Sequence, residues 1–457
     1  MTQFPNSDFV HCHVHSEYSP FDGMLSVNKL VMKAREFGFP ALALTDHGSM
    51  GGAIHFRNEC IATKDKKGKD IPYPTIKPLI GCELYMSANH TNRGKDQQPR
   101  GAKGNHHIVL IAKNYEGYRN LSTLSHTSWT EGFYMSPRID FDLLSKHSAG
   151  LICSSACLAG LVNANLLHGR YDEAKASAAV FKDIFGEDFF LEAMYHGIRL
   201  QSEILPSIIK IGSELDIPVI CTNDVHYLDE SHASSHEVFM CSKGQKCIHS
   251  PNRIKNPYPE FYLKSAQQMA EIFGEVPELL TNTLALADRV DSADIDKNLF
   301  GGMRLPIFEI PSGETPYSHL DKIARKGLKN LGWHTSQKHV DRLNLELEDV
   351  RIVWENNRYD FATYFLIVRD IIRHANEVGI ITGPGRGSGY GSVLLRCIDV
   401  SFGPDPLEYG LLWERFLGFK DARFVKESDF GFEEKIEIVA EEDDRAVEHD
   451  PGGVDRY

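Results

Sequence analysis

The sequence lacks the features that mark membrane and secreted proteins. It has no uncharged apolar run of about 18 residues or more, the length needed to span a bilayer. Its first residues, MTQFPNSDFV, show no basic start followed by an apolar stretch. The nine cysteines are odd in number and form no CxxC pair, so a disulfide framework is not expected. We therefore expect a soluble protein of the reducing cytoplasm, with no membrane partner.

An excess of positive charge is also absent. The chain has 49 Lys and Arg against 63 Asp and Glu, a formal net charge of −14. This balance argues against binding to nucleic acid through bulk positive charge, although a local basic channel or bound metal ions can still engage phosphates. At 457 residues, with 42% hydrophobic and 25% charged residues, the chain is ordinary globular material, long enough for two or three domains.

Short extended segments alternate with helical ones over the first part of the chain. The extended segments read LALTD, PLIGCELYM, HIVLIAK, GLICSS, FFLEAMY and PVICTND. Strands that alternate with helices favour a parallel α/β sheet or barrel. We therefore predict an α/β domain over residues 1–290.

The chain changes in character after residue 290. Residues 291–360 combine a connector rich in Gly and Pro with helical segments. From Phe361 to Val378, apolar residues recur with helical spacing, which predicts a helix that faces a core and ends at Gly379. Residues 433–457 read as an acidic tail.

Three histidines alternate with apolar residues near the N-terminus, in FVHCHVHSEYSPFDG. A period of two places His11, His13 and His15 on one face of a strand and the apolar residues on the other. Asp22 follows closely, and imidazole with carboxylate suits zinc, manganese or iron. The alternative is a polar strand that carries histidines by chance.

Further side chains able to bind metal stand beside the predicted strands. They are Asp46, His47, Glu83, His106, His107, Cys157, Asp224 and His226. In α/β barrels the strand ends and the loops after them converge on one face, where residues distant in sequence meet around a metal. His107 begins its strand instead of ending it, so it fits this arrangement least well. The alternative is a scatter of polar loop residues.

A glycine-rich loop, TGPGRGSGYGS, starts at Thr382. It fits neither GxGxxG nor the P-loop pattern, because its glycines alternate and no Lys-Ser or Lys-Thr pair follows. Small residues that lead into a helix can present backbone N–H groups to an anion, with Arg386 supplying charge. From the residues alone, a phosphate site and a flexible hinge remain alternatives.

A resemblance covers the whole first domain. The segments HCHVHSEYSPFDG, ALTDHGSM, GCELYM, HIVLIAKNYEGYRNL, CSSACLAG and TNDVHYL resemble, in this order, the PHP domain at the N-terminus of bacterial DNA polymerase III alpha subunits. The likeness continues through EFYLKSAQQMAEIF and LLTNTLALADRVD. It implies a PHP-type distorted (β/α)7 barrel over residues 1–290 that holds up to three divalent metal ions, Mn²⁺, Zn²⁺ or Fe²⁺.

The resemblance also implies the ligands. Carried over residue by residue, they are His13, His15, Asp22, His47, Glu83, His107, Cys157, Asp224 and His226. Asp46 would orient a ligand, whereas His11 and His106 would be neighbours. Clustered divalent metals activate water and polarise a phosphoryl oxygen, so the implied activity is phosphoester hydrolysis, specifically 3′ to 5′ trimming of DNA ends.

A second resemblance covers residues 361–432. YFLIVRDIIRHANEVGIITGPGRGSGYGSVLLRCIDV and then DPLEYGLLWERFL look like the start of the alpha-subunit palm. This implies that Arg386, Gly387 and Ser388 contact the triphosphate of an incoming nucleotide, with Arg415 a weaker candidate. Asp429 stands where the first metal-binding aspartate of the palm belongs, but Gly431 stands where the second belongs.

A palm with one carboxylate missing should hold its catalytic Mg²⁺ poorly. We therefore expect a truncated alpha subunit of DNA replication whose PHP domain hydrolyses but which does not polymerise alone. The expected partners are DNA, dNTP, a separately encoded C-terminal polymerase part and other replisome subunits. The alternatives are a stand-alone PHP phosphoesterase for small phosphate esters and a non-catalytic replisome docking module.

Overall fold

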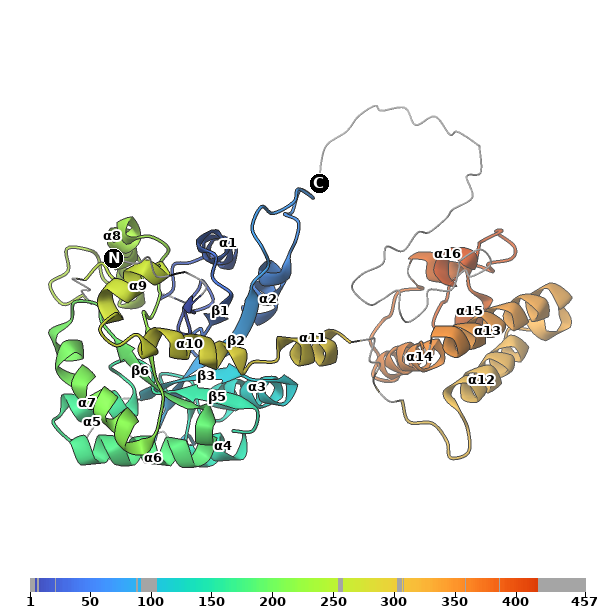
Figure 1. Cartoon of the computed structure of the whole chain (residues 1–457). Coiled ribbons are helices and arrows are strands. Elements are labelled where there is room, and N and C mark those ends of the chain that lie inside the picture. Colours follow the sequence, from blue (N-terminus) through green and yellow to red (C-terminus); the bar gives the residue numbers. More distant parts are fainter. Residues whose placement is uncertain are drawn as a thin grey trace. The chain divides into compact units, whose positions relative to one another are not determined.

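The chain divides into two compact units, Met1–Gly301 and Gly302–Tyr457 (Figure 1). The computed structural model describes residues 5, 8–20, 22–87, 89–91, 105–253, 258–301, 306, 308–357, 359–385 and 387–417. The division lies beyond the predicted boundary at residue 290, because a further helix, Ser292–Phe300, belongs to the first unit.

A mixed sheet forms the centre of the first unit. Its strands are β1 (Ala41–Leu44), β2 (Lys77–Met86), β3 (His106–Ala112), β4 (Arg138–Ile139), β5 (Leu151–Ser154), β6 (Phe189–Met194) and β7 (Val219–Thr222). The order is β1-β2-β3-β5-β6-β7, with β4 paired to β2. The predicted α/β class is confirmed, although the sheet departs from the parallel arrangement that alternating strands and helices favour, because β3 runs antiparallel to both β2 and β5.

The N-terminal segment joins the two ends of this sheet. Ala43 N–H of β1 donates to the His11 carbonyl at 2.9 Å, and His15 N–H donates to the Val225 carbonyl, just after β7, at 2.8 Å. Val225 N–H in turn donates to the His13 carbonyl at 3.2 Å. The segment thus occupies the place of a strand between β1 and β7, although its pairing is too sparse to form a regular one, and the sheet curls toward a barrel.

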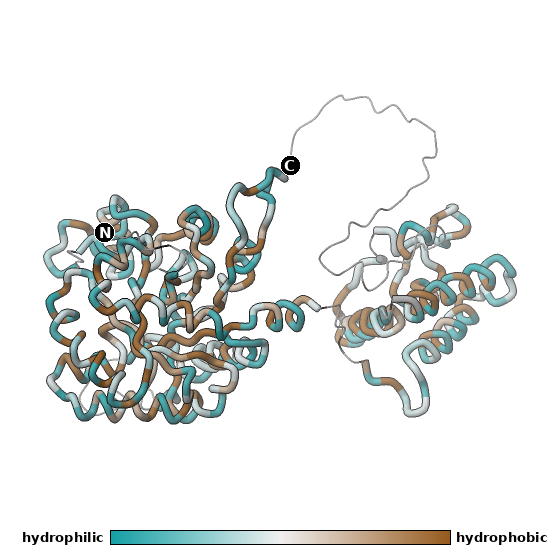
Figure 2. The backbone as a smooth tube through the Cα atoms, viewed as in Figure 1, coloured by the Kyte–Doolittle hydropathy of each residue, from teal (hydrophilic) through white to brown (hydrophobic). Residues whose placement is uncertain are grey.

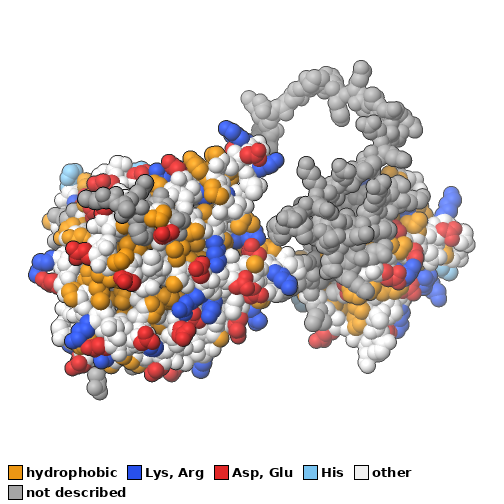
Figure 3. Space-filling view, in the orientation of Figure 1, with side chains coloured by type: hydrophobic (Ala, Val, Ile, Leu, Met, Phe, Trp, Pro, Cys, Tyr) orange, Lys and Arg blue, Asp and Glu red, His pale blue; other side chains and the backbone are white. Residues whose placement is uncertain are grey.

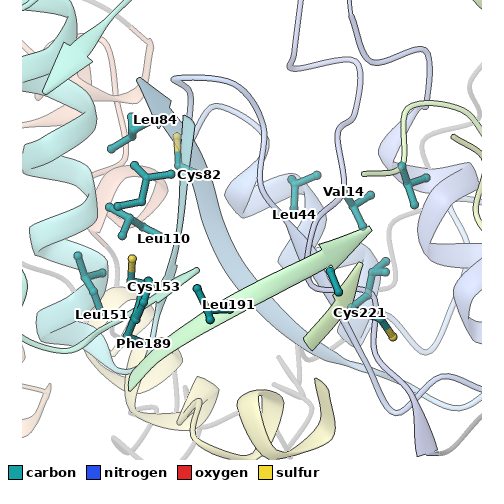
Figure 4. Packing of buried hydrophobic residues seen from close by; sticks show 14 of the residues in the cluster. Val14, Leu44, Cys82, Leu84, Leu110, Leu151, Cys153, Phe189, Leu191 and Cys221 are labelled. Atoms are coloured by element: carbon teal, nitrogen blue, oxygen red, sulfur yellow. The ribbon is translucent and has the colours of Figure 1, made fainter. Parts of the chain in front are cut away.

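Alternation along the strands separates two apolar clusters. The outer cluster lies between the sheet and the surrounding helices and includes Leu84 of β2, Leu110 of β3 and Phe189 of β6 (Figure 4). The inner cluster takes the opposite side chains, Leu79, Val109, Ile111, Ile152, Phe190 and Ile220, together with Leu286 and Ala287. Because both faces of each strand are buried, the strands stand out as apolar segments in Figure 2.

Helices surround the sheet (Figure 1). They are α1 (Val27–Phe37), α2 (Ala53–Ile61), α3 (Tyr115–Thr130), α4 (Phe141–Lys146), α5 (Leu161–Leu167), α6 (Tyr171–Phe185), α7 (Arg199–Leu215), α8 (Ala233–Lys243), α9 (Ala266–Phe273), α10 (Glu278–Asp288) and α11 (Ser292–Phe300). Local signals set several helix starts: Asn114 and Asp140 accept the N–H groups of Gly117 and Leu143. Ser265 and Gln268 form a capping box on α9.

The second unit is helical where the structure describes it. Its helices are α12 (Pro316–Asn330), α13 (Gln337–Asn357), α14 (Phe361–Glu377), α15 (Val393–Cys397) and α16 (Glu414–Leu417), with a 3₁₀ turn, η5, at Gly387–Gly391. Its core combines Leu320 and Leu347, from the expected connector 291–360, with Phe365, Leu394 and Trp413. The helices expected as a connector therefore pack with those that follow residue 361.

A buried carboxylate ties α13 to α15. Glu346 is fully buried and accepts hydrogen bonds from Val393 N–H at 3.0 Å, Leu394 N–H at 2.7 Å and the Ser392 hydroxyl at 2.8 Å. Arg342 Nε donates to the same carboxylate at 2.9 Å. These contacts satisfy the first N–H groups of α15, which begins directly after the glycine-rich loop.

The apolar stripe predicted for Phe361–Val378 is only half buried. The helix forms as α14 and ends before Gly379, whose φ of 77° is left-handed. Phe365 and Leu366 enter the core, but Ile371 is 63% exposed. The prediction that the whole stripe faces a core is therefore wrong for the second half of α14, since no described residue covers it.

The surface of the first unit is mixed in charge. Figure 3 shows acidic and basic side chains interspersed with hydrophobic ones over its visible face. Within the described residues, no helix combines the length and apolarity that crossing a bilayer would require.

Candidate metal centre

At one edge of the sheet, the inward-facing positions of the strands change from apolar to polar side chains. Along β2 the inward positions run from Leu79 to Glu83, and beyond β7 they run from Ile220 to Asp224. Because β3 is antiparallel to its neighbours, its inward series runs the other way and reaches this edge at His107. The position of His107 at the start of its strand, which fitted a parallel sheet poorly, is the one that an antiparallel strand requires.

Four donor atoms converge first. His13 Nε2 and His15 Nε2 lie 3.1 Å apart. His13 Nε2 lies 3.6 Å from Glu83 Oε2 and 3.4 Å from Asp224 Oδ1, and the matching distances from His15 Nε2 are 3.3 and 3.2 Å. Four ligands at the usual zinc distances in a tetrahedron lie about 3.3–3.4 Å from one another. Five of the six distances among these four atoms are therefore 3.1–3.6 Å, close enough for the atoms to bind a shared metal ion.

Two more groups of donors adjoin the first. Asp22 Oδ2 lies 3.3 Å from His47 Nε2, and Asp22 Oδ1 lies 3.4 Å from His226 Nε2. On the other side, Glu83 Oε1 lies 2.7 Å from His107 Nδ1, and the Cys157 sulfur lies 3.6 Å from the same nitrogen. His47 connects the Asp22 group to Glu83, because its Nδ1 lies 2.8 Å from Glu83 Oε2. All nine residues implied as ligands therefore lie in one cluster.

Hydrogen bonds fix which ring nitrogen of His13, His15 and His226 faces the cluster. His13 Nδ1 lies 3.0 Å from a Glu192 oxygen, and His226 Nδ1 lies 2.7 Å from the Asp224 carbonyl. His15 Nδ1 lies 3.2 Å from the Ser19 hydroxyl, which itself donates to Asp46 at 2.7 Å. Each Nδ1 is therefore the donor, which leaves Nε2 bare. Two bare Nε2 atoms at 3.1 Å, as in His13 and His15, must share a cation, which is either a proton or a metal ion.

Several polar atoms of the cluster lack hydrogen bonds. Both oxygens of Glu83, Asp224 Oδ1 and His47 Nδ1 are buried without a partner of hydrogen-bond geometry. Glu83 is only 1% exposed, and unpaired buried carboxylate oxygens are costly. Ligands of a shared metal ion lie at short nitrogen-to-oxygen distances without the alignment of a hydrogen bond, as His47 Nδ1 and Glu83 Oε2 do. The residues present therefore fit bound metal ions.

The carboxylates dominate the electrostatics of the cluster. Burial would lower the pKa of His13, but Glu192, Asp224 and Glu83 raise it well above its ordinary value. Likewise, burial would raise the pKa of Glu83, but His107, His47 and His13 hold it well below its ordinary value. In the metal-free protein this field draws protons onto the imidazoles, and the same field attracts divalent cations, whose binding would release those protons.

Glu192 supports the cluster and was missed in the sequence. It is fully buried on β6, where its carboxylate accepts the Thr222 hydroxyl at 2.6 Å and the Ser154 hydroxyl in addition to facing His13. A carboxylate on the nitrogen opposite the metal orients the imidazole and makes it a stronger ligand. The sequence did contain a signal for it, because a glutamate in the middle of the apolar strand FFLEAM is rarely buried unless it has a charged or hydrogen-bonding partner.

Asp46 lies behind the cluster without entering it. Its carboxylate accepts Ser16 N–H at 2.6 Å, the Ser16 hydroxyl at 2.9 Å and the Ser19 hydroxyl at 2.7 Å. Ser19 in turn contacts His15 Nδ1 and accepts His47 N–H at 3.0 Å. The ligand-orienting contact expected of Asp46 thus runs through Ser19, a residue that no sequence pattern singled out.

The backbone of the cluster is constrained. Asp224 has a φ of 45° and Ala156, just before Cys157, a φ of 58°, a region that residues other than glycine rarely adopt. At Gly23 a Cβ would lie 2.1 Å from the Ser16 carbonyl oxygen, so only glycine permits the turn that follows Asp22. These conformations hold Asp22, Cys157 and Asp224 at the cluster.

His11 and His106 stay outside the cluster. His11 Nε2 lies 2.8 Å from the Lys264 carbonyl, and its ring packs edge-on against Phe9 and Phe39 of the outer cluster. Burial lowers its pKa to about 4. His106 Nδ1 lies 3.1 Å from the Ala159 carbonyl. The expectation that three alternate imidazoles share one face is therefore wrong for His11, because the alternation shifts between Cys12 and His13.

The glycine-rich loop borders a cavity in the second unit. A cavity of about 390 Å³ lies between α14 and this loop, lined by apolar residues such as Phe365, Ile372 and Phe416 and by Gly383 and Gly385. Gly387 has a φ of 53°, and Gly387, Ser388 and Arg415 are exposed. Arg386 and Asp429 lie outside the described residues. Of the implied nucleotide contacts, Gly387, Ser388 and Arg415 are therefore placed, and none of the three lines the cavity.

Comparison with known families matches both units. Residues 11–196 match the PHP domain family, and residues 318–434 match the family described as bacterial DNA polymerase III alpha NTPase domain. Two solved structures, a phosphoesterase from Bifidobacterium adolescentis and an amidohydrolase from Chromobacterium violaceum, each overlap 48% of this chain and 87% of their own. The sequence identities are 15% and 13%, and the TM-scores are 0.25 and 0.26.

Curated relatives extend the match along nearly the whole chain. The DNA polymerase III subunit alpha of Treponema pallidum is 38% identical over 94% of this chain and 35% of its own length. The subunits of Borreliella burgdorferi and Helicobacter pylori are each 38% identical, over 95% and 90% of this chain and 36% and 34% of their own lengths. The chain thus spans about a third of the length of these relatives, and it is similar to bacterial DNA polymerase III alpha subunits over residues that match a PHP domain and an alpha NTPase domain.

Proposed function

We propose that the first unit is a metal-dependent phosphoester hydrolase that trims DNA ends in the 3′ to 5′ direction. The observation that carries this proposal is the convergence of donor atoms from His13, His15, Glu83 and Asp224, with separations of 3.1–3.6 Å from the two histidines to each other and to the two carboxylates. The family links the chain to DNA replication, and DNA is therefore the substrate that we propose.

Nine residues would hold the metals. They are His13, His15, Asp22, His47, Glu83, His107, Cys157, Asp224 and His226. When bound, divalent ions of this kind activate water as a nucleophile and stabilise the charge that develops on a phosphoryl group. We propose Mn²⁺, Zn²⁺ or Fe²⁺, since imidazole and carboxylate ligands suit all three and the Cys157 thiolate favours the softer ones.

Other residues of the unit prepare these ligands. Glu192 and Ser19 keep His13 and His15 in the tautomer whose Nε2 faces the metal. Asp46 holds Ser19 in place by accepting a hydrogen bond from the Ser19 hydroxyl. The inner apolar cluster below excludes water from one side of the site, which strengthens electrostatic interactions there.

We further propose that the second unit is an incomplete polymerase palm. Gly387 and Ser388, with Arg386, would contact a dNTP triphosphate, and a completed palm would use Mg²⁺ with Asp429 as one carboxylate. The exposed side chains of Ile371 and Ile381 favour a further polypeptide that covers them, either a separately encoded C-terminal polymerase part or another replisome subunit. This chain alone would not polymerise.

A nuclease assay tests the proposal. We expect the chain to remove 3′ nucleotides from single-stranded DNA with Mn²⁺ or Zn²⁺, and we expect His13→Ala with Asp224→Ala to abolish this activity, because two of the four converging donors are lost. The variant Glu203→Ala, an exposed residue paired with Arg199, serves as the control and should retain activity. Metal bound without hydrolysis of DNA would contradict the nuclease assignment.

The same preparations separate the alternatives. Hydrolysis of small phosphate esters in place of DNA would favour a stand-alone phosphoesterase, and metal binding without any hydrolysis would favour a replisome docking module. Primer extension should be undetectable for this chain alone, and measurable extension would contradict our interpretation of Gly431.

A further inference from the structure

A lysine contacts the metal-binding cluster from α8. The ammonium group of Lys243, the last residue of α8, lies 2.6 Å from Asp22 Oδ2. Among the ion pairs of the described residues, this is the one contact between a Lys or Arg side chain and a carboxylate of the cluster. The Lys243 side chain is 42% exposed, whereas that of Asp22 is 12% exposed, so the lysine reaches the cluster from the solvent side.

Asp22 itself is firmly held. Its carbonyl oxygen lies 2.8 Å from His236 Nε2, also on α8, and Gly23 fixes the turn behind it. Its carboxylate faces three groups, because Oδ1 lies 3.4 Å from His226 Nε2 and Oδ2 lies 3.3 Å from His47 Nε2 as well as near Lys243. The flexible member of this set is therefore the lysine, whose long side chain ends in solvent-accessible space.

A metal ion at Asp22 would change the balance of charge. In the metal-free protein the ammonium neutralises a carboxylate that is otherwise shared with two imidazoles. A divalent cation bound by Asp22, His47 and His226 would use the Asp22 oxygen that the ammonium contacts, and its own positive charge beside the ammonium would repel it. Once displaced, Lys243 would stand at the solvent side of the metals with no carboxylate of the cluster as a partner.

We propose that Lys243 exchanges partners, holding Asp22 while the site is empty and binding a phosphate oxygen of the substrate once metal has taken Asp22. This inference rests on the proposed phosphoester hydrolase. It makes Lys243 a substrate-positioning residue, since an ammonium is a point charge suited to a phosphate at the mouth of a site. It also predicts two effects of opposite sign when the charge is removed.

Two binding measurements test the exchange. We expect Lys243→Gln to tighten Mn²⁺ binding by roughly three- to tenfold in calorimetric titration of the full chain, because the competing cation is gone. We expect the same variant, saturated with Mn²⁺, to bind inorganic phosphate roughly three- to tenfold more weakly than the wild type. Neither readout depends on turnover. Lys243→Arg keeps the charge and should retain most of the phosphate affinity.

A matched control is available in the same unit. Lys113 forms an ion pair of 2.8 Å with Asp188 and is 37% exposed, yet Asp188 is not part of the cluster. Lys113→Gln should leave both affinities unchanged.

Three results would overturn the inference. Weaker Mn²⁺ binding in Lys243→Gln would mean that the lysine orients Asp22 for the metal instead of competing with it. Unchanged affinities for both Mn²⁺ and phosphate would mean an ordinary surface ion pair. If the wild type binds no Mn²⁺, the proposed metal site fails and the exchange fails with it, whereas failure of the variant alone leaves the metal site standing.

Discussion

Glu83 in the first unit is a charged side chain that is buried, whereas Ile381 in the second unit is an apolar side chain that is exposed. Glu83 is 1% exposed with both carboxylate oxygens lacking hydrogen bonds, whereas Ile381 is 97% exposed beside a glycine-rich loop. The Glu83 carboxylate needs positive charge beside it, and the imidazoles of His107, His47 and His13 are the groups that surround it. The isoleucine needs an apolar neighbour, and no described residue provides one.

This difference distinguishes a site built within the first unit from an apolar surface that the described residues of the second unit leave open. In the first unit, segments from His13 to His226 bring all their donors to one edge of a closed fold. In the second unit, the first half of α14 packs in the core while the second half leaves Ile371 exposed. We infer that the ligands of the metal site all come from the first unit, whereas the proposed palm needs residues beyond the described ones to cover its apolar surface. The predictions below test this asymmetry.

Removal of metal should affect the two units very unequally. A metal held at 100 to 1,000 times its dissociation constant stabilises the state that binds it by about 2.7–4.1 kcal/mol, and chelation removes this contribution. We expect EDTA to raise hydrogen exchange strongly in the N-terminal segment and β7, which carry or adjoin the ligands. Exchange in α12 and α14 should not change. Mass spectrometry of backbone amides would measure both units in one sample.

The double variant His13→Ala with Asp224→Ala is the control for this experiment. Its exchange should no longer respond to EDTA, because the donors are gone. An equal response of α14 in the wild type would contradict the asymmetry and would mean that the two units are coupled or that the second also holds metal.

Glu192→Gln should lower metal affinity while keeping the fold. The amide keeps the shape of the carboxylate but removes the charge that holds His13 as an Nδ1–H donor. Loss of such a partner typically costs about 10- to 100-fold in metal affinity. Titration with Mn²⁺ would measure it, and the circular dichroism spectrum should not change. Glu203→Gln, on the exposed face of α7, should bind metal like the wild type. Equal affinity of both variants would remove Glu192 from its supporting role.

Much of the site could be read from the sequence, and the missing parts have physical reasons. Alternation and motif order indicated His13, Glu83 and Asp224 because the side-chain period of a strand is local. The role of His107 could not be derived from local pattern, since it depends on the antiparallel pairing of β3 with β2 and β5. Ser19 and Lys243 touch the cluster only through the tertiary fold, and short polar or charged residues in loops and helix ends carry no distinguishing pattern.

The fold of the second unit was harder to predict for a related reason. The stripe on α14 has correct helical spacing, and the helix forms where it was expected. Periodicity reports that a face is apolar, but it does not report which polypeptide covers that face. Burial of Phe365 and exposure of Ile371 on the same helix therefore could not be separated from spacing alone.

The smallest effect should come from the exposed end of that apolar surface. Ile381→Lys should change the free energy of unfolding by no more than about 0.5 kcal/mol, because an isoleucine that is 97% exposed loses no packing. Leu366→Ala, in the core of the same unit, should cost about 2–5 kcal/mol. Urea denaturation followed by circular dichroism would compare them. A cost above about 1 kcal/mol for Ile381→Lys would show that the chain already covers this residue. The second measurement is binding to a polypeptide that corresponds to the part of the relatives that this chain does not match. If Ile381→Lys has a negligible cost in stability but loses this binding, the apolar surface around Ile381 contacts that polypeptide.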